Sequence, residues 1–228
     1  VNPLNSKVKT FVASGLFLLL LFAGLAWGVA DHAPWVRGFD RAVSGFFASA
    51  ESPLNTGIFK LVGTLGSPAT VIGLTAVLCL FLWIKRDLIT ALWAFGIQLF
   101  GSAIAEIIKQ LVARARPLHQ LVPDTGYSFP SGHTFCTVLF VFTLLMLGLP
   151  LLHDQETKLV AVLAGMIWIG LVAASRVYLR DHFATDVVAS VLLATGYWLI
   201  ITPFAAAVQD ALRRWIPERI QTLWTHKN

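Results

Sequence analysis

The sequence predicts an all-α integral membrane protein, a bundle of six transmembrane helices with a further helix along the outer membrane interface. Hydrophobic residues make up 57% of the 228 residues and charged residues only 13%, whereas soluble domains are about half apolar and about a quarter charged. Six stretches of 17 to 24 residues also contain no Asp, Glu, Lys or Arg. About 20 apolar residues are enough for a helix to cross the hydrocarbon core. None of these stretches alternates like a barrel strand, so the spans are predicted to be helices.

The six predicted spans form a single membrane domain over residues 1–228, and they occupy residues 10–30, 61–84, 88–108, 133–152, 159–175 and 184–208. The first span follows Lys7 and Lys9 and ends in small residues, as a signal peptide does. Its apolar run is longer than a signal-peptide core, so we expect a retained helix. Cys79 and Cys136 lie in apolar runs and are expected in the core rather than in a disulfide.

Residues 34–52, between the first two spans, are predicted to form an amphipathic helix at the outer interface. Apolar residues recur at helical spacing on one face, and charged residues occupy the other. Pro34 suits a first helical position, and Pro53 closes the segment. This helix is either a connector with an aromatic anchor or a rim beside which a lipid enters. The tail after Gln209 is expected to be a cytoplasmic interfacial segment; it contains Trp215, Ile216, Pro217 and Trp224.

The basic residues orient the predicted bundle. An even number of spans places both termini on one side, which would hold nine Lys and Arg residues against eight on the other. Setting aside Lys109, Arg116 and Arg176 as functional residues leaves nine against five. By the positive-inside rule both termini are then cytoplasmic. The net charge of +5 is therefore interpreted as basic membrane flanks, and no nucleic-acid partner is predicted.

The polar residues of the spans gather at one membrane face. The third span ends, the fourth begins, the fifth ends and the sixth begins on that face. Polar side chains are costly in a membrane and therefore mark functional sites. The residues concerned are Lys109, Arg116, Ser131, Gly132, His133, Arg176, His182 and Asp186.

These residue types favour the binding and transfer of a phosphate. Lys109, Arg116 and Arg176 are three cations without a matching run of carboxylates, and convergent cations suit phosphate oxygens. Ser131 stands at the expected N-cap of the fourth span, where free amides and the helix dipole attract anions. Gly132, directly after it, allows a ligand to approach the backbone closely.

The two histidines are expected to divide the chemistry. His182 and Asp186 are four residues apart, which makes them neighbours on one helical face. A carboxylate on one imidazole nitrogen fixes the tautomer and leaves the other nitrogen free to attack. His133, beside the predicted phosphate site, is placed to protonate a leaving oxygen. Two histidines and an aspartate also suit a metal, but the three cations would repel it, so neither a metal nor another cofactor is predicted.

Each residue also has a purely structural interpretation. Lys109 and Arg116 could extend from helix ends to the membrane surface. His182 and Asp186 could be a structural hydrogen-bonded pair, and Ser131 only a helix start. Short motifs taken singly have high false-positive rates, so the functional interpretation depends on the motifs occurring together on one face.

The motifs together resemble the three-part signature of the type 2 phosphatidic acid phosphatase (PAP2) family, whose site is similar to that of vanadium haloperoxidases. The first motif is Lys109, six residues, then Arg116-Pro117, and the second is Pro130-Ser131-Gly132-His133. The third is Ser175-Arg176, five residues, His182, three residues and Asp186. Every signature position is present, and the six-span layout also resembles the membrane branch of that family.

The resemblance implies a mechanism. His182 would attack phosphorus to give a phosphohistidine, with Asp186 orienting it, and His133 would protonate the leaving group and later activate water. Lys109, Arg116, Ser131, Gly132 and Arg176 would hold the phosphate oxygens at the outer membrane face. Outside the signature, we expect loop salt bridges or solvated side chains at Arg114, His119, Arg180 and Asp181.

The leading hypothesis is therefore a lipid phosphatase in the bilayer that acts on phosphatidylglycerophosphate, phosphatidic acid or undecaprenyl pyrophosphate. The nearest alternative is a lipid phosphotransferase that uses the same site. A transporter or channel is a hypothesis from another class, but the predicted charges lie at one face rather than at the midplane. Haloperoxidases are soluble, which disfavours that activity. No oligomeric state follows from the sequence.

Overall fold

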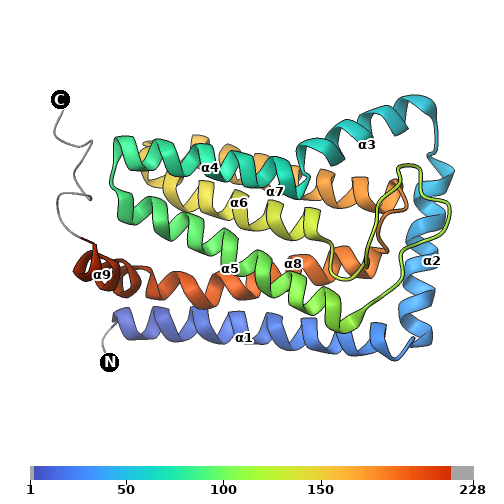
Figure 1. The fold of residues 1–228 in the computed structure, drawn as a ribbon, viewed down its shortest axis with the longest axis horizontal. Helices are drawn as coiled ribbons and strands as arrows, with labels where there is room; N and C mark the ends of the chain where they lie inside the picture. The colour runs from blue at the N-terminus through green and yellow to red at the C-terminus, as the bar shows by residue number, and fades with distance from the viewer. Residues whose placement is uncertain (1–2, 217–228) are drawn as a thin grey trace.

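The computed structural model describes residues 3–216 as a bundle of long helices. The long helices are α1 (Pro3–Ala30), α4 (Pro68–Lys85), α5 (Leu88–Val112), α6 (Gly132–Gly148), α7 (Gln155–Tyr178) and α8 (Ala184–Ile201). They run side by side, while α2 (Pro34–Ser49) lies across the end of the bundle opposite the two termini (Figure 1).

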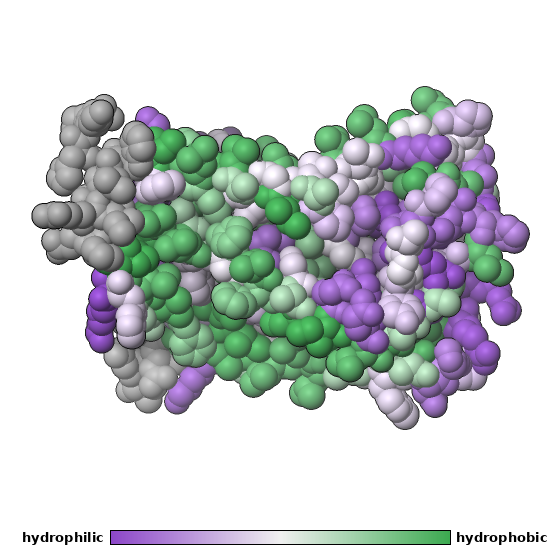
Figure 2. Space-filling view, viewed as in Figure 1, coloured by the Kyte–Doolittle hydropathy of each residue, from purple (hydrophilic) through white to green (hydrophobic). Residues whose placement is uncertain are grey.

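The surface fits a multi-pass membrane protein. Six helices within the described part of the chain are long and apolar enough to cross a membrane. Hydrophobic residues cover the shaft of the bundle, whereas hydrophilic residues gather at the end that carries α2 (Figure 2). The predicted all-helical class with six spans is thereby confirmed.

The core forms around α6, which packs against α4, α5, α7 and α8. Its residues Phe135, Val138 and Leu139 are completely buried. On the outside of the bundle, α1 packs along α8 where two glycines meet. A Cβ atom on Gly15 would lie 2.9 Å from the carbonyl oxygen of Gly196, so only glycine permits this approach.

The predicted helix 34–52 and the predicted span 61–84 are wrong in their boundaries. The segment forms two helices, α2 and α3 (Pro53–Leu65), and the span begins only at Pro68. The side chain of Ser52 accepts from the backbone N–H of Asn55, and so starts α3 as an N-cap. The chain then turns at Gly66, where a Cβ would lie 2.6 Å from Val172 of α7. Because the stretch around this turn carries no charge, hydropathy did not reveal the break.

The predicted last span, 184–208, is also wrong at its end. Helix α8 stops at Ile201, a 3₁₀ turn covers Thr202–Phe204, and α9 (Ala205–Trp215) follows. Pro203 lacks a backbone N–H and cannot continue the α8 hydrogen-bond ladder. Of the predicted interfacial tail, Trp215 and Ile216 belong to the described residues, and Pro217 and Trp224 lie outside them.

The remaining spans differ at their ends by a few residues. The span predicted at 88–108 continues to Val112, and the span predicted at 159–175 extends over Gln155–Tyr178. The span predicted at 133–152 ends as an α-helix at Gly148 and continues as a 3₁₀ turn, Leu149–Leu151. Helix α7 begins early because Asp154 caps it by accepting from the N–H of Thr157.

Candidate active site

Two connecting segments bring the predicted site residues together at the α2 end of the bundle. The longer one, residues 113–131, joins α5 to α6, and the shorter one, residues 179–183, joins α7 to α8. Ala113, the C-cap residue after α5, has a left-handed φ of 48° and turns the chain back across the end of the bundle. All eight predicted site residues lie on or beside these two segments.

His182 is held with one ring nitrogen bonded and the other facing a guanidinium. Its Nδ1 lies 2.7 Å from the carbonyl oxygen of Ser128. A carbonyl oxygen only accepts, so Nδ1 carries the proton and Nε2 keeps its lone pair. Nε2 lies 3.3 Å from Nη1 of Arg116. Burial lowers the pKa of His182, against the opposing effect of Asp186, so the ring is neutral and nucleophilic near neutral pH.

Asp186 lies behind His182 and is completely buried. Its Oδ2 is 3.6 Å from Nδ1 of His182 and accepts from the N–H of Phe183 at 2.9 Å. The predicted reason for this pairing is wrong, because His182 precedes α8 and does not share a helical face with Asp186. The pair forms because the Asp186 side chain, in the first turn of α8, folds back over the helix start.

Arg116 and Arg176 both pair with the carboxylate of Asp124, which lies in the segment 113–131. Oδ2 of Asp124 lies 3.0 Å from Nη1 of Arg116 and 3.3 Å from Nη2 of Arg176. Arg116 also donates to the backbone carbonyls of Asp181 and Thr125, each at 2.9 Å. The two guanidiniums therefore converge on one anionic group, which is the arrangement that an oxyanion requires.

The start of α6 supplies the second part of the site. Ser131 is completely buried, and its hydroxyl oxygen accepts from the N–H of Thr134 at 3.5 Å, which confirms it as the N-cap. A Cβ on Gly132 would lie 3.8 Å from Nζ of Lys109, so the ammonium lies beside the amide end of α6. The side chain of His133 makes no hydrogen bond within residues 3–216 and lines a cavity.

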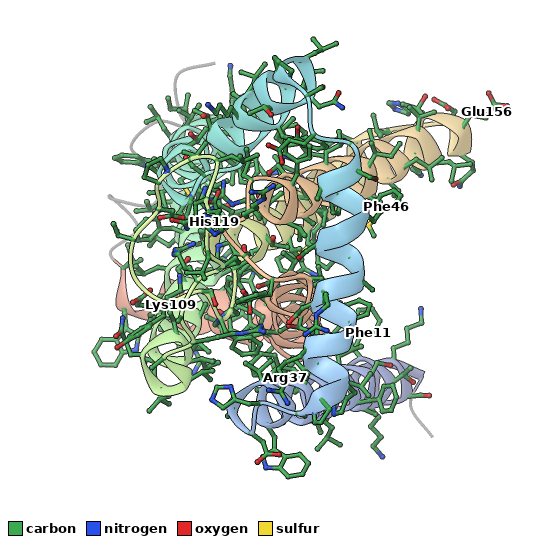
Figure 3. All side chains as sticks on the ribbon, turned by 90° about the vertical axis from the view of Figure 1, so that its right-hand side faces the viewer. Phe11, Arg37, Phe46, Lys109, His119 and Glu156 are labelled. Atoms are coloured by element: carbon green, nitrogen blue, oxygen red, sulfur yellow. The ribbon has the colours of Figure 1, made fainter. Side chains whose placement is uncertain are left out.

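Two cavities lie at this end of the bundle, and His182 lines one of them. The first, the α3-side cavity, has a volume of about 470 Å³ and is lined by Lys60, Gly63, Thr64, Ser67, Leu121, Val122, Pro123, Asp124, His133, Arg176 and Leu179. The second, the α2-side cavity, is about 370 Å³ and lies between α2 and residues 117–119, with His182 in its wall. Figure 3 looks onto this end of the bundle, where Lys109 and His119 lie on one side of α2 and Phe46 projects on the other.

One cluster at the site has the donor types of a metal centre. A ring nitrogen of His133, one of His182 and a carboxylate oxygen of Asp124 all lie within 4.8 Å of one another. However, the Asp124 carboxylate is already paired with two guanidiniums, which would face any bound cation. Like charges at this distance repel strongly, so the cluster fits an anion better than a metal ion.

A comparison with protein families identifies the family to which a chain with this site belongs. The model of the PAP2 superfamily matches residues 87–210, more than half of the chain. The chain belongs to the PAP2 superfamily. Its branch is that of the membrane enzymes related to phosphatidylglycerophosphatase B and undecaprenyl-diphosphatase.

Curated PAP2 relatives from three organisms are similar over most of the chain. Phosphatidylglycerophosphatase B of Bacillus subtilis is 28% identical over 83% of this chain and 91% of its own length. Lipid A 1-phosphatase of Rhizobium etli is 30% identical over 86% of this chain and 82% of its own. Undecaprenyl-diphosphatase of Sulfolobus acidocaldarius is 30% identical over 63% of this chain and 66% of its own length.

A solved structure shares the fold. The crystal structure of the first transmembrane PAP2 type phosphatidylglycerolphosphate phosphatase from Bacillus subtilis superposes with a TM-score of 0.71. It covers 90% of this chain and 98% of its own, at 23% sequence identity. This similarity supports the arrangement of the PAP2 bundle.

Sequence reasoning missed several residues of the PAP2 site. Arg114, expected in a loop salt bridge or in solvent, joins two buried carboxylates, Asp40 on α2 and Asp186. Asp124 and Ser128 were not singled out. Ser128 acts through its carbonyl oxygen, which any residue type would supply, and the spacing of the motifs gives no signal for either residue.

Like Arg114, Arg180 and Asp181 form ion pairs, as expected for these residues outside the signature. Arg180 pairs with Glu51 at 2.5 Å, and both side chains are substantially exposed. Asp181 pairs with Arg176 at 2.7 Å, but its side chain is completely buried. Burial raises the pKa of Asp181 to about 6, although Arg176 acts in the opposite direction.

Proposed function

We propose that this PAP2 protein is a lipid phosphatase that hydrolyses a lipid phosphate monoester or diphosphate through a phosphohistidine intermediate. The observation that carries the proposal is the free Nε2 of His182, since Nδ1 is bonded to the carbonyl oxygen of Ser128. Nε2 faces Arg116, whose guanidinium shares Asp124 with Arg176, and the cavity beside it is lined by His133. A nucleophile, convergent cations and a proton donor are the parts that phosphoryl transfer needs.

In the first step, Nε2 of His182 attacks the phosphorus and the bond between phosphorus and the lipid oxygen breaks. His133 takes up a proton as the anionic phosphate binds beside it, and gives that proton to the departing oxygen, which leaves as the lipid alcohol. Asp186 orients the imidazole and stabilises the positive ring that forms. Lys109, Arg116 and Arg176, with the amides that follow Ser131 at Gly132 and His133, hold the phosphate oxygens.

In the second step, neutral His133 takes a proton from water as the water oxygen attacks the phosphorus. The bond from phosphorus to Nε2 of His182 breaks, so inorganic phosphate leaves and both histidines return to their starting states. No step needs a metal ion, since arginine and lysine cations carry the charge of the phosphoryl oxygens.

The lipid is expected to lie in the α3-side cavity. Attacking and leaving groups lie on opposite sides of phosphorus in phosphoryl transfer. His133, the proton donor, lines the α3-side cavity, whereas His182 lines the α2-side cavity. The leaving lipid oxygen would therefore point toward α3, whose outer face exposes Leu54, Ile58 and Leu61 for contact with acyl or prenyl chains.

Phosphatidylglycerophosphate, phosphatidic acid and undecaprenyl pyrophosphate are the proposed substrates, and the relatives add lipid A as a fourth test substrate. Lys60 lines the mouth of the α3-side cavity and forms no ion pair within the described chain. Its ammonium is available to a second anionic group, so a diphosphate is a favoured substrate within this class. We further propose one domain over residues 1–228, with cytoplasmic termini and an extracytoplasmic site.

The test is a panel of the four lipid phosphates, assayed for release of orthophosphate by purified protein with and without a chelator. Wild-type protein should release phosphate from at least one lipid at the same rate in both conditions. His182→Ala should remove release by about 10³-fold or more while the protein stays folded, because no other side chain replaces the nucleophile.

The control is Arg37→Ala, an exposed substitution outside the site that should behave as wild type. Near-normal turnover by His182→Ala would overturn the assigned nucleophile, and loss of activity with chelator would overturn the metal-free mechanism. A phosphorylated acceptor in place of orthophosphate would identify a lipid phosphotransferase.

A further inference from the structure

Helix α2 contributes a buried acidic residue to the end of the bundle. Asp40 is only 4% exposed, although the same helix exposes Trp35 and Phe46. Its Oδ2 accepts from Nη2 of Arg114 at 2.6 Å and from the hydroxyl of Thr185 at 2.9 Å. Its Oδ1 accepts from the N–H of Thr185, also at 2.9 Å. The carboxylate is therefore directed toward the start of α8, where Asp186 lies.

Arg114 connects Asp40 to Asp186. Its Nη1 donates to Oδ1 of Asp186 at 2.5 Å and to the hydroxyl of Thr185 at 2.8 Å. The guanidinium also lies 4.0 Å above the ring of Phe183, a cation–π contact. The planar, five-donor guanidinium matches this set of partners in a way that a lysine ammonium would not.

The contacts fix the orientation of the Asp186 carboxylate. Oδ1 is bonded to Arg114, which leaves Oδ2 to accept from Phe183 and to face Nδ1 of His182. The same residues also determine the net charge next to His182, the proposed nucleophile. Arg114 alone would cancel the charge of Asp186, whereas two carboxylates around one guanidinium leave a net charge of −1.

We propose that Asp40, acting through Arg114, is a positioning residue that keeps one oriented negative charge behind His182. The inference rests on the proposed function. When Nε2 bonds to phosphorus while Nδ1 keeps its proton, the imidazole ring becomes formally cationic, and the electron pair of the broken P–O bond leaves with the lipid oxygen. The net −1 of the Asp40–Arg114–Asp186 cluster offsets this positive ring.

Asp40→Asn keeps the size of the side chain and removes the charge. The kcat for phosphate release from a lipid monophosphate in micelles is expected to fall by about 10- to 100-fold, as for other partners that orient an active group. KM should change much less, because Asp40 touches no phosphate ligand. Asp40→Glu, which restores the charge, should recover part of kcat. Arg37→Ala, exposed on the same helix, is the matched control and should leave kcat unchanged.

The pH dependence separates an electrostatic role from a structural one. The acid limb of kcat/KM follows the loss of a proton from His182. Without Asp40 the imidazolium is less stabilised, so the limb should move to lower pH in Asp40→Asn. The other charged or titratable groups that face or adjoin His182 are unchanged in this variant; they are Asp186, Arg114, Arg116, Arg176, His133, Asp124, Asp181, Arg41, His119 and Arg180.

Asp186→Asn, measured in parallel, separates the two proposals. If it is as active as wild type, the assignment of Asp186 within the proposed function fails. If it is impaired while Asp40→Asn keeps its kcat and its acid limb, only the present inference fails. If Asp40→Asn loses kcat but the acid limb of its kcat/KM profile stays at the wild-type pH, the role of Asp40 is structural and the present inference is also overturned.

A variant at Thr185 covers the case in which Asp40→Asn gives no cooperative melting curve. Thr185→Val removes the hydroxyl shared by Asp40 and Arg114 but leaves every charge in place. Its acid limb should stay at the wild-type pH, and its kcat should lie between those of wild type and Asp186→Asn. A shifted limb in this variant would contradict the charge-based role.

Discussion

Asp181 has the most informative titration outside the membrane-spanning segments. Its carboxylate is completely buried beside Arg176, and burial raises its pKa from 3.8 to about 6. A carboxyl group whose pKa rises on folding stabilises the folded state when protonated. That contribution is complete below about pH 4 and is lost as the pH rises through about 6.

Asp181→Asn should therefore remove a pH dependence of stability. Between about pH 4 and pH 6 the melting temperature of wild type should fall relative to that of the variant, and above pH 7 the difference should stay constant. The pKa rise of Asp181 corresponds to a change in the free energy of unfolding of order 3 kcal/mol. Thermal melting in detergent at pH 4, 5, 6 and 7 measures it.

Asp154→Asn is the matched control for this experiment. Hydrogen bonds from Thr157 hold the pKa of the exposed Asp154 below its usual value. Its contribution is therefore present at higher pH and is lost as the pH falls, which is the opposite sense. A pH dependence of equal sign in both variants would contradict the assignment to Asp181.

Helix α3 closely approaches the proposed phosphate site at Gly63. A Cβ on Gly63 would lie 3.0 Å from Nη1 of Arg176. The guanidinium would have to shift by a few tenths of an ångström to accommodate it. Because Arg176 is proposed to hold a phosphate oxygen, such a shift should weaken binding of the transition state.

Gly63→Ala is expected to lower kcat/KM for the lipid phosphate by about 10-fold, since small displacements of positioning groups have large kinetic effects. Steady-state phosphate release in micelles measures it. Gly57→Ala on the same helix places its Cβ in open space and should match wild type. Equal activity in the two variants would show that α3 does not position Arg176.

The sequence predicts the spans well because the hydrocarbon core imposes a simple requirement for length and apolarity. It does not reveal α3, because its exposed residues Leu54, Ile58 and Leu61 are as apolar as those of a span. The site residues that belong to the signature were predictable from spacing and topology. Asp40 and Arg114 were not, since 74 residues separate them and neither belongs to a motif.

At the scale of the whole molecule, the described chain ends and the proposed site lie at opposite ends of the bundle. The described ends of the chain lie at one end of the bundle, and α2 and the segment 113–131 lie at the other (Figure 1). The α3-side and α2-side cavities are lined by residues at this second end. An even number of spans requires the two described chain ends to lie on the same side. The separation of the chain ends from the site also means that a single labelling experiment determines which side of the membrane the site faces.

Single cysteines at the two ends test the proposed orientation, in a background where Cys79 and Cys136 are replaced by alanine. Asp31→Cys lies exposed where α1 meets α2, and His153→Cys lies exposed before α7 at the opposite end. In intact cells a membrane-impermeant maleimide should label residue 31 and reach residue 153 only after permeabilisation. The reverse pattern would place the site in the cytoplasm.

The carboxylate of Asp124 gives the protein a counter-ion of its own between two guanidiniums. Docking of a substrate is therefore an ion exchange in which a monoanion must be expelled. A terminal phosphate carries up to two charges and competes well, whereas the phosphodiester of an ordinary bilayer phospholipid carries one and gains little. In a membrane where diesters vastly outnumber monoesters, this internal competitor would keep the enzyme from being saturated by the lipids that surround it.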